Sequence, residues 1–212
     1  MTGDTQHPID PASSTGTGTA VTRKGSKTRT LILRTAMTQF GEQGYRGASL
    51  RDIAARCRIS HPGLLYHFPN KEALLLAVLA HRDAVDRAEH SIADDAGLDV
   101  FRRFVRSAAV NQGRRGIVEL FVVVSAESTS VEHPAHQFFQ LRYARIVDEV
   151  TQAYTVAQAA GETVDGLEPR VAAQQFIALM DGLQIQWLLD TTAVDMPSVL
   201  RSHIESTLTA TL

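Results

Sequence analysis

The sequence predicts an all-α protein of about nine helices, and three observations support this fold class. Apolar residues recur at every third or fourth position over most of the chain, which is the period of an amphipathic helix. Alternation of apolar and polar residues, typical of a strand, does not extend over any useful length. Serine, asparagine and proline residues stand at the places where these helices would begin.

Composition divides the chain into three parts. Residues 1–22 are rich in Thr, Ser, Gly and Asp and contain no aromatic residue, so we expect a disordered tail. Residues 23–70 are expected to form a DNA-binding domain, and residues 71–212 a second helical domain. The sequence has one cysteine and shows neither a secretory signal nor an apolar run long enough for a bilayer, which favours a cytoplasmic protein without a membrane partner.

The N-terminal elements follow from apolar spacing and from capping residues. The first predicted helix starts near Lys27 and stops around Gly41–Gly44, and its apolar face is formed by Leu31, Ile32, Thr35, Ala36 and Phe40. Three further helices are predicted from N-cap residues, which are Ser49, Ser60 and Asn70. In the third helix Pro62 and Gly63 occupy first-turn positions, where an amide has no acceptor within the helix.

The second half is predicted to form five more helices, over residues 98–112, 114–128, 134–160, 169–190 and 197–211. Pro169 and Pro197 suit the first turns of the last two helices, because the missing N–H of a first-turn proline breaks no helical hydrogen bond. Pro134 likewise marks the start of the third of these helices, with His133 as its cap.

Charge is distributed unevenly along the chain. The net charge is −2, but residues 23–58 contain nine basic and two acidic side chains. Residues 59–212 contain twelve basic and nineteen acidic side chains. Such an asymmetry points to a polyanion partner at the basic end. Three short helices with a tight turn between the second and third are also the layout of a helix-turn-helix, so the sequence predicts binding to double-stranded DNA.

The same segment resembles a known family. Residues 47–79, GASLRDIAARCRISHPGLLYHFPNKEALLLAVL, closely resemble the DNA-binding segment of the TetR (tetracycline-repressor-like) family, whose usual form is T-[ST]-x-x-x-IA-x-x-[AC]-G-V-S-x-x-x-[LF]-Y-x-[HY]-F-x-[NS]-K-[ED]-x-L. A dozen positions match: Ser49, Ile53, Ala54, Ile59, Ser60, Leu64, His67, Phe68, Asn70, Lys71, Glu72 and Leu74. The resemblance covers about residues 28–79, and the stretch ALMDGLQIQWLLD is similar to the dimerisation helix of many members. It implies a homodimeric transcriptional regulator that responds to a ligand.

Two positions depart from the family's pattern. Arg58 stands where the usual turn glycine would be, which costs about 1 kcal/mol if the backbone there is left-handed. Leu65 replaces the usual tyrosine, and Tyr66 follows one residue later. A shift of one residue turns a side chain by about 100° around the helix. Tyr66 is therefore either a phosphate contact from a different angle or a surface aromatic residue.

The candidate DNA-binding residues are Ser49, Arg51, Arg58, Ser60, His61, Pro62, Gly63, Tyr66, His67 and Lys71. Ser49, Arg51 and Lys71 are candidates for phosphate contacts, which set register without reading sequence. Lys71 lies in a first helical turn, where a cation is unfavourable against the helix dipole, and this favours an external anion. His61 and Tyr66, with His67, are the candidates for contacts in the groove, because Pro62 and Gly63 carry no side chain that reads bases. Gly63 would allow close approach of backbone and DNA.

The helix at residues 169–190 predicts a partner. Its only charge between Arg170 and Asp190 is Asp181, and its apolar residues lie nearly all round it, so it must be covered on all sides. We expect a homodimer interface made by this helix and the last one, with Phe176, Leu183, Trp187, Leu200, Ile204 and Leu208. The alternative is a helix at the centre of a monomer.

The remaining helices have aromatic-rich inner faces, typical of a pocket for a small apolar effector. The candidate pocket residues are Phe101, Phe104, Val105, Phe121, Val124, Phe139, Arg142, Tyr143, Phe176 and Met180. Gln112, Glu127, Arg142 and Gln184 are candidate polar anchors. Ordinary core packing is the alternative for each apolar residue.

Other chemistry is weakly supported. His133 and His136 have a spacing that suits a metal, but no third ligand is evident, so neither a metal nor another cofactor is expected. Cys57 is interpreted as a small packing residue rather than a redox switch. The sequence offers no nucleophile–base set, so no catalytic residue is assigned. We predict a ligand-responsive repressor released from a palindromic operator. An all-α enzyme with an accessory basic module and an effector-free DNA-binding protein are the alternatives.

Overall fold

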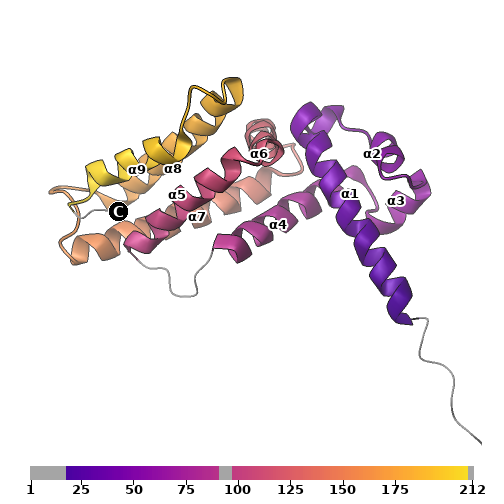
Figure 1. The fold of residues 1–212 in the computed structure, drawn as a ribbon, viewed down its shortest axis with the longest axis horizontal. Coiled ribbons are helices and arrows are strands. Elements are labelled where there is room, and N and C mark those ends of the chain that lie inside the picture. Colours follow the sequence, from indigo (N-terminus) through magenta and orange to yellow (C-terminus); the bar gives the residue numbers. More distant parts are fainter. Residues whose placement is uncertain (1–17, 91–96, 210–212) are drawn as a thin grey trace, which may run out of the picture.

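The computed structural model describes residues 18–90 and 97–209, and the side chains of residues 25–86 and 97–209. In this part of the chain there are nine helices (Figure 1): α1 (Gly18–Gly47), α2 (Leu50–Arg56), α3 (His61–His67), α4 (Lys71–His90), α5 (Leu98–Gln112), α6 (Arg115–Glu127), α7 (His136–Ala159), α8 (Pro169–Leu189) and α9 (Met196–Thr207). The β-structure recorded for these residues is one isolated bridge, between Thr163 and Leu208. The predicted all-α fold of about nine helices is confirmed.

The helices form two groups that α4 and α6 connect. Figure 1 shows α1, α2 and α3 together at one end of the molecule and α5, α7, α8 and α9 at the other. The N-terminal helix α1 packs along α4 and, over a longer stretch, along α6. In the C-terminal group α8 packs against α7 and α9, and α5 packs against α9. No helix of the described residues has the length and apolarity needed to cross a membrane.

Two apolar cores hold these groups. The first contains the buried side chains of α1–α4, including Ile32, Phe40 and Leu64, together with Leu120 and Val124 of α6. The second is formed by α5–α9 around the fully buried rings of Phe101, Tyr154 and Phe176. Because α6 contributes to both cores, any displacement of α6 acts on the N-terminal helices directly.

The first helix differs from its predicted range. Helix α1 begins at Gly18 rather than near Lys27, so residues 18–22 of the expected disordered tail are helical, and residues 1–17 lie outside the described residues. The helix is interrupted at Gly44, whose φ of 68° and ψ of 179° are not helical. This interruption falls at the end of the predicted stop at Gly41–Gly44, and glycine adopts a positive φ without steric cost.

Two helix ends in the second half also differ from prediction. Helix α7 begins at His136, not at Pro134, because residues 129–135 form turns in which the Nδ1 atom of His133 accepts the N–H of Ala135 at 3.2 Å. Helix α9 ends at Thr207 rather than at residue 211. Leu208 is extended, and the N–H of Thr209 donates to the carbonyl of Glu162 at 2.9 Å. Pairing with this distant segment of the same chain replaces the last helical turn.

Candidate DNA interface and effector cavity

Serine side chains cap both helices of the helix-turn-helix. The Oγ atom of Ser49 accepts the N–H of Asp52 at 3.4 Å, and that of Ser60 accepts the N–H of Gly63 at 3.1 Å. A Cβ atom on Gly63 would lie 3.1 Å from the Ser60 hydroxyl, which is a tight contact. Gly63 therefore makes room for the cap of α3, in addition to allowing the close approach of DNA that the sequence predicts. Pro62, at the second position of α3, needs no N–H there.

Arg58 forms the turn between α2 and α3 with a left-handed backbone. Its φ is 56°, and among the described residues it is the non-glycine residue with a positive φ. Such a conformation costs an L-residue about 1 kcal/mol or more. The side chain of Arg58 is exposed, so a cation stands beside the N-terminal end of α3.

Several of the candidate DNA-binding side chains are available to a partner. Arg51, Ser60 and Pro62 are exposed, and Tyr66 is 86% exposed with its ring edge-on to that of His67 at 5.3 Å. Ser49, His61, Gly63 and His67 are partly exposed. Beneath them Ile53, Ala54, Leu64 and Phe68 are buried, as expected for the small core, and Ile59 is partly buried.

Lys71, predicted to contact a phosphate, has partners within the chain. Its ammonium group donates to the carbonyls of Arg46 and Ala48 at 3.3 and 3.1 Å and lies 4.7 Å from the ring centre of Tyr45. These carbonyls belong to the end of α1 and the residue after it. They supply the negative partner that a cation in a first helical turn requires, so an external phosphate is not needed to explain Lys71. We therefore leave Lys71 out of the proposed DNA contacts.

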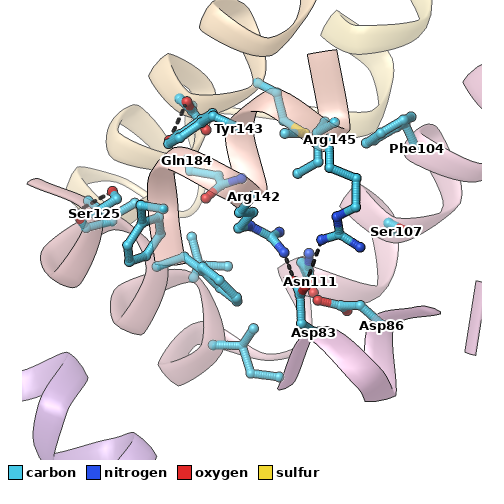
Figure 2. Close-up of a pocket in the computed structure, with 18 of the residues that line it drawn as sticks. Asp83, Asp86, Phe104, Ser107, Asn111, Ser125, Arg142, Tyr143, Arg145 and Gln184 are labelled. Atoms are coloured by element: carbon cyan, nitrogen blue, oxygen red, sulfur yellow. Dashed lines mark hydrogen bonds and ion pairs between the residues drawn. The ribbon is translucent and has the colours of Figure 1, made fainter. Parts of the chain in front are cut away.

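A cavity of about 240 Å³ lies among α4, α5, α6, α7 and α8 (Figure 2). Six of the ten predicted pocket residues line it: Phe104, Phe121, Phe139, Arg142, Tyr143 and Met180. Of the predicted polar anchors, Arg142 and Gln184 line it as well. Arginine side chains cover part of the aromatic surface. Arg142 lies over the ring of Phe121 at 4.5 Å, and Arg103 lies over the ring of Phe104 at 5.0 Å.

The other predicted pocket residues do not line this cavity. Phe101, Val105 and Phe176 are buried in the C-terminal core, and Val124 is buried in the core that α6 shares with the N-terminal helices. Ordinary packing, the alternative left open by the sequence, therefore accounts for these four. The two remaining polar anchors also have other partners: Gln112 donates to the carbonyl of Val194 at 3.3 Å, and Glu127 accepts the N–H of Tyr45 at 2.7 Å.

Charged residues missed by the sequence analysis line the cavity. They are Asp83, Asp86, Arg103, Arg145, Glu149 and Asp181. Arg142, Arg145 and Glu149 are spaced to share one face of α7, a pattern that could have indicated a charged inner surface. The cavity therefore has more charged residues than the aromatic-rich pocket with a few polar anchors that was expected.

Two clusters of charged residues lie on the cavity wall. Asp83 is 7% exposed and pairs with both Arg142 and Arg145 of α7. On the wall formed by α8, Asp181 accepts a hydrogen bond from the Tyr143 hydroxyl at 2.8 Å. Burial raises the pKa of Asp181, whereas the Tyr143 hydrogen bond and the nearby charge of Arg142 lower it. Burial lowers the pKa of Arg142 to about 10, and the charge of Arg145 contributes to this decrease.

The predicted dimer-interface residues lie inside the single chain. Phe176, Leu183, Trp187, Leu200, Ile204 and Leu208 are each at most 5% exposed and belong to the C-terminal core. Packing within the subunit accounts for the burial of these residues, so we do not place the subunit interface on them. The opposite face of α8 is exposed and uncharged, and it carries Val171, Gln174, Gln175, Ala178, Ile185, Gln186 and Leu189.

The two histidines considered for a metal have protein partners. The Nδ1–H of His136 donates to the carbonyl of Ser128 at 2.8 Å, and Nδ1 of His133 lies 2.9 Å from the Ser128 hydroxyl. Burial lowers the pKa of His133, the charge of Glu127 raises it and that of Arg46 lowers it. Among the described residues no group of three or more His, Cys, Asp and Glu side chains could hold a metal ion. Cys57 is buried in the N-terminal core, as its interpretation as a packing residue requires.

Comparison with known proteins covers both groups of helices. The family described as "Bacterial regulatory proteins, tetR family" matches residues 32–78, and the one described as "BetI-type transcriptional repressor, C-terminal" matches residues 98–209. A 49-residue segment is 45% identical to the HTH-type transcriptional regulator YuxN of Bacillus subtilis, and it spans 23% of this chain and 17% of YuxN.

Solved structures resemble the chain over most of its length. A TetR-family regulator from Rhodococcus sp. has a TM-score of 0.67 at 27% identity, with 87% of this chain and 100% of that chain covered. A transcriptional regulator from Saccharomonospora viridis, solved in complex with choline, has a TM-score of 0.70 at 27% identity, with 86% and 98% covered. The N-terminal match, the C-terminal match over more than half of the chain and the nine-helix architecture of the described residues agree: the chain belongs to the TetR family of transcriptional regulators and has a BetI-type C-terminal domain.

Proposed function

We propose that this protein is a homodimeric cytoplasmic repressor that binds a pseudo-palindromic operator and is released by a small organic effector. Residues 23–70 would contact DNA, and residues 71–212 would hold the effector and the partner subunit. The description of the matching C-terminal family as that of a transcriptional repressor supports repression over activation. The TetR family is one of regulators and not of enzymes, so the alternative of an all-α enzyme is excluded.

The observation that carries the DNA-binding proposal is the exposed N-terminal end of α3. His61 and Pro62 occupy its first two positions, and Tyr66 extends from its next turn into solvent. In a helix-turn-helix the N-terminal residues of this helix face base edges in the major groove. We assign base contacts to His61, Tyr66 and His67, and phosphate contacts to Ser49, Arg51 and Arg58.

The proposed dimer uses the exposed face of α8 defined above. A strip of apolar and glutamine side chains without a charge is unusual for a solvent-facing helix and suits a helix–helix contact with a second copy. The two-fold axis of such a dimer would place two α3 helices on one face of the DNA, which is how symmetric proteins recognise palindromic sites.

The cavity supports the proposed effector. It is bordered by five helices, and two of them, α4 and α6, also pack on α1. The choline complex of the Saccharomonospora regulator supports a small organic molecule as the ligand class in this fold. The mixed lining favours an effector with both apolar and polar parts over the small apolar effector predicted from the sequence. The cavity also counts against an effector-free DNA-binding protein. To reduce the DNA-competent fraction from 99% to 1%, an effector must prefer the released state by roughly 10⁴-fold.

Operator binding tests the proposal. The purified protein is titrated against duplex DNA from upstream of its own gene and against random duplex, at several salt concentrations, with fluorescence anisotropy as the readout. We expect a preference for the upstream DNA and an affinity that falls steeply with salt. His61→Ala should reduce the specific affinity about tenfold or more, since one base contact is worth about 1–3 kcal/mol. The matched control is His81→Ala, at an exposed histidine on α4. Equal affinity for both duplexes at every salt concentration would refute the proposal.

A further inference from the structure

The strongest unexplained feature of the cavity is the Asp83 cluster, which consists of Asp83, Arg142 and Arg145. Figure 2 shows both guanidinium groups directed toward Asp83. Arg145 pairs with Oδ2 of Asp83 at 2.6 Å, and Arg142 pairs with Oδ1. Two arginines from successive turns of one helix, converging on one carboxylate, form the kind of site that proteins use to bind an organic anion.

The carboxylate in this site comes from the helix that leads to the DNA-binding segment. Asp83 lies on α4, whose first residue, Lys71, donates to two carbonyls at the end of α1. The intervening residues Leu74, Leu75, Val78 and Leu79 are buried in the core that α4 shares with α1–α3. A displacement of Asp83 would therefore be transmitted along α4 to the helices that contact DNA.

Electrostatics decide which ligand can displace Asp83. The Arg142 side chain is 20% exposed, and burial, followed by the charge of Arg145, lowers its pKa to about 10. If a neutral or cationic ligand pushed Asp83 away, the largely buried Arg142 and the 43% exposed Arg145 would both lose the carboxylate with which they pair. Leaving a buried charge without its partner is strongly unfavourable. An anionic ligand avoids this penalty because it replaces the lost carboxylate.

We propose that the effector carries a carboxylate, which takes the place of Asp83 between Arg142 and Arg145 and thereby displaces α4. This inference rests on the proposed function and specifies its ligand class and its switch. The body of the ligand would lie against Phe104, Phe121 and Phe139, which line the same cavity.

A different ligand class would use the other wall of the cavity. Asp181, with the Tyr143 hydroxyl and the Gln184 carboxamide nearby, is where a cation would bind, and a cation there would leave the Asp83 cluster intact. Carboxylate and cation therefore make opposite predictions for variants of Asp83.

Binding of three matched aromatic probes to the full-length protein distinguishes the two classes. Benzoate, benzamide and benzyltrimethylammonium are titrated by calorimetry into the wild type and into Asp83→Asn. Because the neutral carboxamide of this variant would no longer compete for the arginines, benzoate should bind the variant about tenfold or more tightly than it binds the wild type. Benzamide should show no such gain. Asp148→Asn is the matched control, since Asp148 is an exposed carboxylate on α7 that pairs with Arg170 and does not line the cavity.

A second variant keeps the test decisive if Asp83→Asn does not fold. The Arg145 side chain is 43% exposed, so Arg145→Gln should fold, and it should lose benzoate affinity about tenfold. An unchanged benzoate affinity in both variants, or tighter binding of benzyltrimethylammonium than of benzoate by the wild type, would overturn the inference. Failure of the wild type to prefer its operator would instead refute the proposed function, whatever benzoate does.

Discussion

Arg58 combines a backbone cost with a position close to the proposed DNA surface. Its φ of 56° is one that glycine adopts freely, and its side chain is exposed. We predict that Arg58→Gly raises the free energy of unfolding by about 1 kcal/mol, measured by urea denaturation, because the steric cost of the left-handed backbone is removed. The same variant should bind the operator more weakly, with a salt slope smaller by about one.

Arg58→Ala separates the two effects of that substitution. Alanine removes the charge but keeps the Cβ atom, so operator binding should weaken as in the glycine variant while stability does not rise. If alanine and glycine stabilise the protein equally, the backbone of Arg58 is not the source of the cost.

Single residues were predictable where the interaction is local in sequence. Ser49, Ser60 and Asn70 cap helices as predicted, because a cap bonds an amide only a few residues away. The partners of Lys71 are carbonyls more than twenty residues earlier in the chain. Nothing in the local sequence identifies such a partner, and the same limit hid the pairing of Asp83 with Arg142 and Arg145.

At the scale of elements, the periodicity located every described helix but not every end. The predicted range 98–112 coincides with α5, because a glycine follows it directly. The starts of α1 and α7 and the end of α9 were misplaced. For α9 the end is set by pairing of Thr209 with Glu162, which is a tertiary contact that overrides helical propensity.

A carboxylate of α6 adds a hydrogen bond to its apolar contact with α1. Glu127, the last residue of α6, accepts the N–H of Tyr45 at 2.7 Å, just after the interruption of α1 at Gly44. We predict that Glu127→Ala lowers the free energy of unfolding by about 1–3 kcal/mol, because a partly buried amide loses its acceptor. Glu127→Gln keeps an acceptor oxygen and should restore most of the loss in urea denaturation.

Two further variants define the role of Glu127. Glu132→Ala removes a nearby exposed carboxylate and should change stability little. Gly44→Ala should be destabilising in its own right, because the added Cβ atom would clash with a Glu127 carboxylate oxygen and φ is +68°. Equal losses from Glu127→Ala and Glu132→Ala would show that the hydrogen bond to Tyr45 contributes nothing.

For the whole molecule, the sequence predicted that α8 is covered on all sides but not which face the monomer covers. Apolar residues around the full circumference of a helix do not indicate which side faces the core of the subunit. That side is set by where α7 and α9 pack. The structure buries Phe176, Leu183 and Trp187 within the subunit and exposes Ala178 and Leu189. The cavity was similarly anticipated between the right helices, while its charged lining comes from packing α4 against them.

The quaternary proposal makes opposite predictions for the two faces of α8. Ala178 is exposed near the middle of the uncharged strip, so Ala178→Lys should leave the subunit folded but place a charge in the proposed interface. We expect the protein to sediment as a monomer in analytical ultracentrifugation and to lose operator affinity, because two half-sites are no longer bound together. Ala109→Lys, at an exposed position on α5, is the matched control and should remain dimeric. On the buried face, Leu183→Ala should lower the free energy of unfolding by about 2–5 kcal/mol without changing the subunit number. If Ala178→Lys stays dimeric, the exposed face of α8 is not where the subunits meet.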